Sequence, residues 1–228
     1  MPHALNFDSN ADAARFYTSL GVAVLPSHHP IALPGRSDHG RRLYACSCKS
    51  PDCAHPARHP IGALTIDHAT VNPDRVAAWW AANPDANVVT PAGHMLDFIE
   101  LRRPLPVEHL TAWLAAHGID AAPIIHSAPG SLQFPVRASE PPAARYAPLS
   151  RGGVLLHGPE TFVLLPPSRR IDGHVTTWLR PFDQRTVILP DGEELFAALT
   201  QLPGDHDLHA WYHEQEREPD GQLSGTRP

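Results

Sequence analysis

Residues 46–60 read CSCKSPDCAHPARHP and hold all three cysteines of the 228-residue chain. They lie within a longer segment, 27–66, that shows no hydrophobic periodicity and contains five prolines and five histidines. A segment of this composition cannot build a hydrophobic core of its own. We therefore predict a long loop that is held together by an internal cross-link.

The spacing of the cysteines indicates a metal site rather than a set of disulfides. Three thiols within eight residues, in a chain whose N-terminus shows no signal peptide, are not typical of a disulfide framework. We predict zinc ligation by Cys46, Cys48, Cys53 and His59, with His55 as the alternative fourth ligand. A closed four-ligand shell would make this zinc structural, and three reduced thiols without metal are the competing interpretation.

Short helices and strands are expected on both sides of this segment. Capping residues, prolines and apolar spacing predict helices over 11–20, 73–82, 106–117 and 193–202. Apolar runs bounded by turn residues predict strands over 22–26, 87–90, 95–101, 123–126, 131–136, 154–156, 162–165 and 176–179. This alternation predicts an α+β fold in a single domain over residues 1–202. Residues 203–228 are polar and acidic, and we expect them to form a disordered tail.

The charge of the chain is uneven. Its formal net charge is −6, so the whole surface is not that of a general nucleic-acid binder. Residues 34–60, in contrast, hold five basic against two acidic side chains, and this segment can still meet phosphate. No apolar run approaches the roughly 20 residues that cross a bilayer. We expect a cytoplasmic protein with no membrane partner.

Two further stretches complete a recognisable pattern. Residues 79–89 read WWAANPDANVV, and residues 162–178 read FVLLPPSRRIDGHVTTW. With the motifs C-x-C-x4-C-x5-H-P and P-P-S-x4-G-x4-W, residues 11–182 resemble the N-terminal domain of bifunctional DNA primase/polymerases, the prim-pol family of the archaeo-eukaryotic primase superfamily. The resemblance implies an RRM-like catalytic-type sheet, an N-terminal α/β unit, and a zinc stem at about 34–60 near the nucleic-acid path. It also implies paired acids that hold two divalent cations, Mg²⁺ or Mn²⁺, for nucleotidyl transfer.

The acidic pair of the family is only partly matched. Family members carry Asp-x-Asp on the first catalytic strand; Asp97 matches the first acid, and Ile99 stands at the second position. Glu100 follows directly, where strand alternation turns its side chain to the face opposite Asp97, unless a β-bulge brings the two acids together. Asp97 and Glu100 are therefore the candidate catalytic residues.

Other positions of the family pattern are substituted. Ser131 stands where a His is expected, Leu155 and His157 stand where an Asp and an Arg are expected, and Arg170 replaces a His after Pro-Pro-Ser. Two divalent ions need several carboxylate ligands, so these substitutions predict a relative that has lost polymerase activity. An active primase-polymerase with a remodelled metal site is one alternative. A zinc-stapled protein-interaction or regulatory module is the other.

Binding of nucleic acid or nucleotides is the function that the resemblance leaves in place. We expect contacts from Ser168, Arg169, Arg170 and Arg180, because the guanidinium group presents a bidentate fork to phosphate; a plain solvated face is equally compatible with the arginines. The partners would be DNA or RNA and nucleotides. The chain has no G-x-x-x-x-G-K-S/T motif, so unwinding would need a separate helicase or replication protein.

Overall fold

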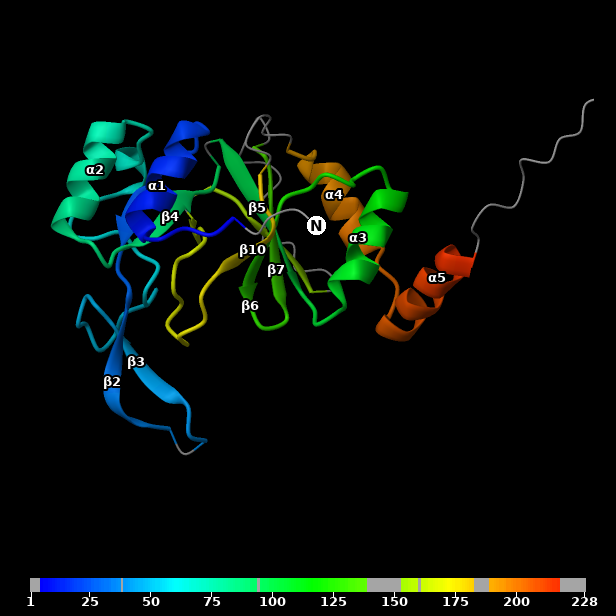
Figure 1. Cartoon of the computed structure of the whole chain (residues 1–228), viewed down its shortest axis with the longest axis horizontal. Coiled ribbons are helices and arrows are strands. Elements are labelled where there is room, and N and C mark those ends of the chain that lie inside the picture. The colour runs from blue at the N-terminus through cyan, green and yellow to red at the C-terminus, as the bar shows by residue number, and fades with distance from the viewer. Residues whose placement is uncertain are drawn as a thin grey trace, which may run out of the picture.

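The computed structural model describes residues 5–37, 39–93, 95–138, 153–159, 161–182 and 189–217. Figure 1 shows the chain coloured from blue at the N-terminus to red at the C-terminus. The elements of the described residues are, in chain order, α1 (Asn10–Ser19), β1 (Leu25–Ser27), β2 (Pro30–Arg36), β3 (Arg42–Cys46), the 3₁₀-helix η1 (Ile66–His68), α2 (Pro73–Ala82), β4 (Asn87–Pro91), β5 (Leu96–Arg102), α3 (Val107–Ala116), β6 (Ile124–Ala128), β7 (Ser131–Arg137), β8 (Val154–His157), β9 (Phe162–Leu164), β10 (Thr177–Arg180), α4 (Gly192–Thr200) and α5 (Asp205–Arg217).

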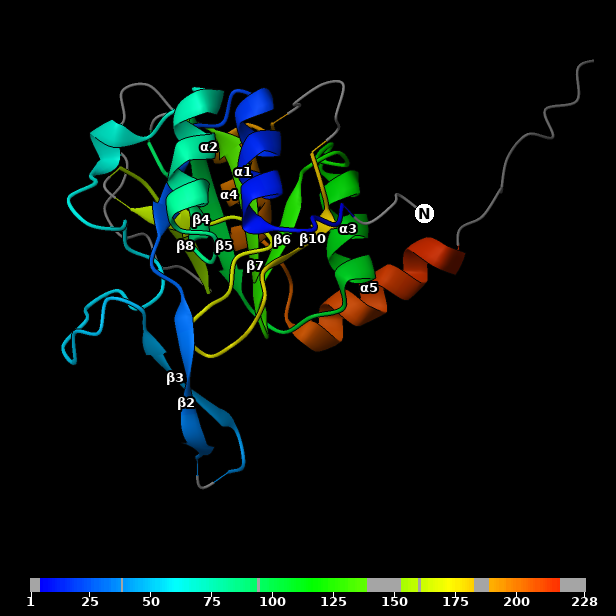
Figure 2. The same ribbon diagram turned by 60° about the vertical axis from the view of Figure 1, so that its left-hand side comes forward.

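Antiparallel sheets organise these elements. The main sheet has the strand order β10–β6–β7–β5–β8, a smaller sheet has the order β1–β4–β9, and β2 pairs with β3 in a separate hairpin. Figures 1 and 2 show α1 and α2 on one side of the main sheet, α3 and α4 on the other, and the hairpin projecting away from the body. The predicted α+β class is confirmed.

Strand β5 separates two hydrophobic cores. Phe98 is buried with residues of α1, α2 and β4, whereas Ile99 and Leu101 are buried with residues of α3 and α4. The ladder between β5 and β7 runs from Leu96 to Arg102 without a register shift. Alternate side chains of β5 therefore point to opposite faces of the sheet along the whole strand, and the predicted option of a bulge is not realised.

The bounds of helix α2 agree with the sequence prediction for a local reason. The side chain of Asn72 accepts hydrogen bonds from the backbone N–H groups of Asp74 and Arg75, and Pro73 occupies the first turn, where no partner for its missing N–H is needed. Trp80 is buried, and its indole N–H donates to the carbonyl of Ala86. The capping signal and the apolar face are both local, so the sequence alone suffices to locate this helix.

Tyr17 joins the N-terminal unit to the main sheet. Its ring is fully buried, its hydroxyl donates to the carbonyl of Pro166 at 2.6 Å, and it accepts the indole N–H of Trp178 at 2.9 Å. Burial raises the pKa of Tyr17 well above its ordinary value, so the hydroxyl stays a donor at neutral pH. This chain of hydrogen bonds ties α1, the segment after β9 and β10 into one body.

The predicted loop at 27–66 contains the hairpin of β2 and β3, which we call the stem. Its register pairs Pro30 with Cys46 and Ala32 with Tyr44. Nearly all of β2 is exposed, so neither of its faces needs an apolar side chain, and the period-2 pattern that predicts a strand is missing. The hairpin begins at Pro30 and ends at Cys46, so it overlaps the first part of the zinc stem predicted at about 34–60.

The C-terminal region differs from the predicted disordered tail. Residues Asp205–Arg217 form α5, while residues 218–228 lie outside the described residues. Leu208 is buried, and the ring of Trp211 makes an edge contact with Trp113 of α3. The polar composition of this segment does not predict a helix, because only one narrow face of α5 packs on the rest of the protein. In the part of the chain that the structure describes, no helix has the length and apolar character needed to cross a membrane.

Candidate functional site

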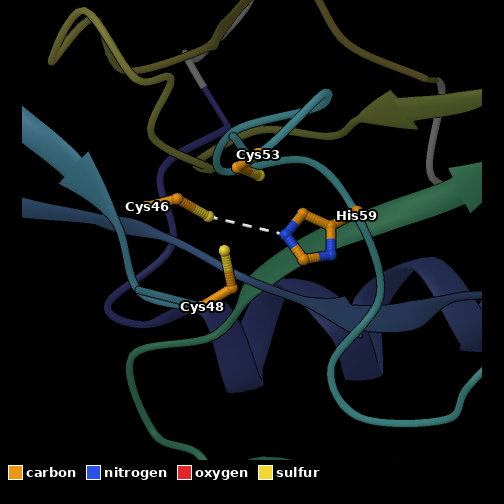
Figure 3. Close-up of side chains that lie close together, drawn as sticks. All are labelled: Cys46, Cys48, Cys53 and His59. Carbon is orange, nitrogen blue, oxygen red and sulfur yellow. Dashed lines mark hydrogen bonds between the residues drawn. The ribbon is translucent and has the colours of Figure 1, made fainter. Parts of the chain in front are cut away.

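The four predicted zinc ligands meet at the base of the stem. Their ligand atoms all lie within 4.8 Å of one another, and Figure 3 shows the four side chains turned toward a common centre. Sγ of Cys46 lies 3.5 Å from Nε2 of His59, close to the roughly 3.6 Å expected for sulfur and nitrogen ligands of one tetrahedral zinc ion. The cluster of Cys46, Cys48, Cys53 and His59 can hold a metal ion, and the alternative ligand, His55, lies outside it.

The surroundings of the cluster favour ligation. The backbone N–H of Ser50 lowers the pKa of the Cys48 thiol, which favours the thiolate that binds metal. Burial raises the pKa of Cys53 to about 11, so metal binding must release this proton and will weaken as the pH falls. Burial also lowers the pKa of His59 and keeps its imidazole neutral, the form that ligates. The backbone N–H of Ala57 donates to Sγ of Cys46 at 3.2 Å.

A second polar site is a cavity of about 730 Å³ between the main sheet and β9. Among the described residues that line it, Glu100 supplies the one carboxylate. Arg58 of the segment that follows the stem, Arg102 of β5 and Arg170 supply guanidinium groups, and His157 of β8 supplies an imidazole. We refer to this as the Glu100 cavity. Its excess of cationic groups suits an anionic ligand.

Both carboxylate oxygens of Glu100 have partners. The hydroxyl of Ser131 donates to Oε1 at 2.5 Å, and Nε2 of His157 lies 2.7 Å from Oε2. The guanidinium group of Arg102 lies 3.1 Å from Oε1 and 3.2 Å from Oε2. Ser131 is itself held by Ser127, whose hydroxyl oxygen lies 2.8 Å away. The carboxylate is thus fixed in place by residues of β5, β6, β7 and β8.

These contacts determine the charge of Glu100. Burial by itself would raise its pKa, but the hydrogen bonds from His157, Arg102 and Ser131 outweigh that effect and lower the pKa from 4.5 to about 2. Glu100 is therefore ionised across the physiological range. A carboxylate in this state serves as a fixed anion and an acceptor, and it is a poor proton donor at neutral pH.

Asp97 lies on the other face of the sheet. It is buried and pairs in the ladder with Val136, which belongs to the core beneath α3 and α4. The prediction that Asp97 and Glu100 point to opposite faces agrees with this geometry. Asp97 does not line the Glu100 cavity, which opens on the side of Glu100, and its role as a catalytic acid stays a prediction. Strand alternation predicts that the two side chains point to opposite faces of the sheet. Only the packing of the other elements shows which of these faces borders the cavity.

The substituted family positions fall on both faces. In the ladder between β5 and β8, Leu155 stands opposite Glu100 and His157 stands opposite Phe98, so both are on the cavity side. Ile99 is fully buried in the core beneath α3 and α4. A carboxylate at position 155 would face Glu100 across the ladder, whereas leucine offers no oxygen ligand there.

The three predicted phosphate-binding arginines do not form one edge. Arg170 lines the Glu100 cavity, whereas Arg169 lines a different hollow beside Asn87 and Pro167. The guanidinium group of Arg180 donates to the carbonyls of Asp120 and Ala122. Consecutive residues on an extended segment point to opposite sides, which separates Arg169 from Arg170.

Ser168 is a structural residue rather than a ligand contact. It is fully buried, its hydroxyl donates to the carbonyl of Val88 at 3.0 Å, and it accepts the N–H of Val88 at 2.8 Å. Its carbonyl accepts a hydrogen bond from Thr176. These bonds connect the segment after β9 to β4, so this hydroxyl is not available to nucleic acid.

Comparison with known proteins agrees with the arrangement of sheets, stem and cavity. The family model of the bifunctional DNA primase/polymerase, N-terminal domain matches residues 14–214. The chain belongs to the prim-pol family. No curated protein matches it significantly. Membership implies binding of nucleic acid and nucleotides, and the match covers the stem, the Glu100 cavity and most of α5.

The sequence assigns no role in the Glu100 cavity to several of the residues that line it. Arg102 stands two positions after Glu100 on β5 and so shares its face, a signal that becomes useful once the cavity face is known. In the sequence Arg58 is only one of the basic residues of segment 34–60, whereas in the structure this neighbour of His59 lines the cavity. In the sequence Ser131 and His157 are departures from the family pattern, and in the structure both contact the carboxylate of Glu100.

Proposed function

We propose that this prim-pol chain binds the phosphate groups of nucleic acid or of a nucleotide in the Glu100 cavity and does not carry out nucleotidyl transfer. The observation that carries this proposal is the composition of the cavity wall. Among the described residues, three arginines and a single carboxylate line the cavity, and both oxygens of that carboxylate already have partners. Arginine is well suited to phosphate because its planar fork can donate two parallel hydrogen bonds.

The acidic groups argue against catalysis. Two-metal nucleotidyl transfer needs several carboxylate oxygens to hold the cations against the triphosphate. Glu100 would have to give up Ser131, His157 and Arg102 to become a metal ligand. Leu155, opposite Glu100, cannot assist it, and Asp97 lies on the far face of β5. The residues present fit an anion better than a pair of divalent cations.

We also propose that the metal of the stem is zinc. Three thiolates and one imidazole form a donor set that zinc prefers, and a closed shell leaves no position for substrate. Bound zinc would hold the segment that carries Arg58 against the Glu100 cavity, which this arginine lines. The metal thus acts on binding through the position of this arginine and takes no part in chemistry.

Binding is tested with fluorescently labelled single- and double-stranded DNA and RNA, followed by anisotropy across a range of salt concentrations. Arg58→Ala combined with Arg170→Ala should weaken binding uniformly across sequences and reduce the slope of log K against log salt by about 2. Arg169→Ala is the matched control, because this neighbouring arginine lines a different hollow. Unlabelled nucleoside triphosphate should compete if the cavity accepts a free nucleotide.

Two outcomes would overturn the proposal. The absence of binding to any nucleic acid or nucleotide at low salt would favour a zinc-stapled interaction or regulatory module. Extension of a primed template, or synthesis on an unprimed one, with Mg²⁺ or Mn²⁺ would favour an active enzyme with a remodelled metal site. Glu100→Gln serves as the control in that assay, because contaminating polymerase would be unaffected by this change.

A further inference from the structure

A group of three histidines lies apart from both sites described above. His109 belongs to α3, and His209 and His213 belong to α5. One ring nitrogen of each lies within 4.8 Å of the corresponding nitrogen of the other two. His109 is buried, whereas His209 and His213 are exposed. The group therefore bridges two helices that are far apart in sequence and side by side in Figures 1 and 2.

The spacing on α5 is that of a metal-binding helix. Residues i and i+4 lie one turn apart on the same helix face, which places His209 and His213 together. The centroids of their rings are 4.4 Å apart, and the ring of His109 stacks on that of His209 at 5.2 Å. One ring nitrogen from each of the three imidazoles therefore lies close to the other two.

The distances suit a transition metal. Imidazole ligands at about 2.0–2.1 Å from a tetrahedral zinc ion lie about 3.3 Å from one another. Nitrogen atoms already within 4.8 Å need only small side-chain rotations to reach that spacing. Two of the three rings are exposed, so they can rotate without disturbing the core. A three-histidine set also leaves one coordination position open toward solvent.

We propose that His109, His209 and His213 form a second metal site that binds a divalent transition metal of imidazole-preferring type, with Zn²⁺ as the physiological candidate. Its all-nitrogen donor set distinguishes it from the thiolate-rich stem cluster, and Cu²⁺, Ni²⁺ and Co²⁺ fit the same donors. The site is independent of the function proposed for the Glu100 cavity.

The expected consequence is a metal-dependent attachment of α5. Without metal, the helix is held by buried Leu208, by the contact between Trp211 and Trp113, and by the ion pair between Arg103 and Asp205 at 2.5 Å. A metal shared between α3 and α5 would add a cross-link near the middle of the helix. Because two of the three ligands are exposed and none is a thiolate, this metal should be removed by chelator before that of the stem.

The site is tested on the untagged full chain by counting bound metal after equilibrium dialysis against micromolar Zn²⁺. Wild type should retain about two zinc ions per chain, one in each four-coordinate site, whereas His213→Gln and Cys48→Ser should each retain about one. His206→Ala is the matched control, because it lies on the same helix, is fully exposed and is not part of the group. It should retain the wild-type amount.

The spectrum of Co²⁺ separates the two sites. The stem cluster should give intense thiolate-to-cobalt absorption, which Cys48→Ser removes and His213→Gln leaves unchanged. Hydrogen exchange in α5 should slow on adding Zn²⁺ to wild type and to Cys48→Ser, and should not respond in His209→Asn or His213→Gln. These exposed substitutions avoid the packing defect that His109→Ala would introduce.

The proposal fails if saturating Zn²⁺ gives one ion per chain that Cys48→Ser abolishes. It also fails if the second ion persists in His213→Gln, or if it binds only at millimolar metal. Any of these outcomes would make the three histidines an aromatic packing contact between α3 and α5. None of them bears on the phosphate-binding proposal, because no residue of this group lines the Glu100 cavity.

Discussion

The stem cluster and the Glu100 cavity are built in different ways. The four metal ligands come from one stretch, residues 46–59, and depend on turns within it. The groups around Glu100 come from β5, β6, β7, β8 and the segments that carry Arg58 and Arg170. A metal site supplies its own folding free energy locally, whereas a buried carboxylate needs the whole fold to provide its partners. The stem cluster can therefore lose its structure while the Glu100 cavity stays intact. The Glu100 cavity, in contrast, is lost when the body of the protein unfolds.

The largest expected effect is loss of the stem metal. Cys48→Ser removes one ligand, and metal binding to such sites is worth on the order of 10 kcal/mol or more, so the segment should lose its order. Limited proteolysis should then cut between residues 42 and 60 while the body stays folded by circular dichroism. Ser50→Ala, an exposed neighbour, is the control. A stem as resistant in Cys48→Ser as in wild type would show that the metal is not needed.

The substitution Glu100→Gln tests how much the buried carboxylate of the cavity contributes to the stability of the body. The folded-state pKa of Glu100 is about 2 against an ordinary value of 4.5, so the carboxylate contributes stability that is fully present above about pH 4.5 and is lost as the pH falls through 2. The variant should be about 2–3 kcal/mol less stable than wild type at pH 7, and the difference should shrink on acidification. Urea unfolding between pH 7 and pH 3 measures this. An equal difference at every pH would contradict the ionic network.

Gly173→Ala tests how the stem and the cavity wall are connected. Gly173 has φ +84°, and an added Cβ would lie 2.5 Å from a ring carbon of Tyr44 on β3. We expect a loss of about 1–2 kcal/mol from the left-handed backbone, together with displacement of Tyr44. Hydrogen exchange in β3 should therefore rise. Gly118→Ala, with φ +75° and open space around it, should show the backbone cost alone. Equal exchange in β3 for both variants would show that the stem is not docked here.

The smallest expected effect comes from Arg102→Ala. The Arg102 side chain is 59% exposed, so its ion pair with Glu100 is screened by solvent and should contribute only about 0.5 kcal/mol to stability. His157→Ala should cost more, because the His157 side chain is 20% exposed and lies 2.7 Å from Oε2. Urea midpoints at pH 7 rank the two variants. The reverse order would mean that Arg102 is the principal partner of Glu100.

Features with local causes could be predicted from the amino-acid sequence. Helix α2 follows from Asn72, Pro73 and its apolar face, and the metal cluster follows from ligand spacing within one segment. The α+β class follows from the alternation of short elements, and the prim-pol family follows from motifs that lie in continuous stretches.

Contacts between residues that are distant in the sequence could be seen only in the folded structure. The alternation of side chains along β5 places Asp97 and Glu100 on opposite faces of the sheet. Only the packing of β9 and α4 on those two faces shows that Glu100 faces the cavity. Arg169 and Arg170 diverge because consecutive side chains of an extended segment point apart. The histidines of α3 and α5 lie close together because α5 packs on the body through the buried side chain of Leu208. The sequence of this polar helix shows no hydrophobic periodicity that would predict it. These contacts depend on the packing of elements that are far apart in the chain, and a single sequence does not show which of its residues are neighbours in space.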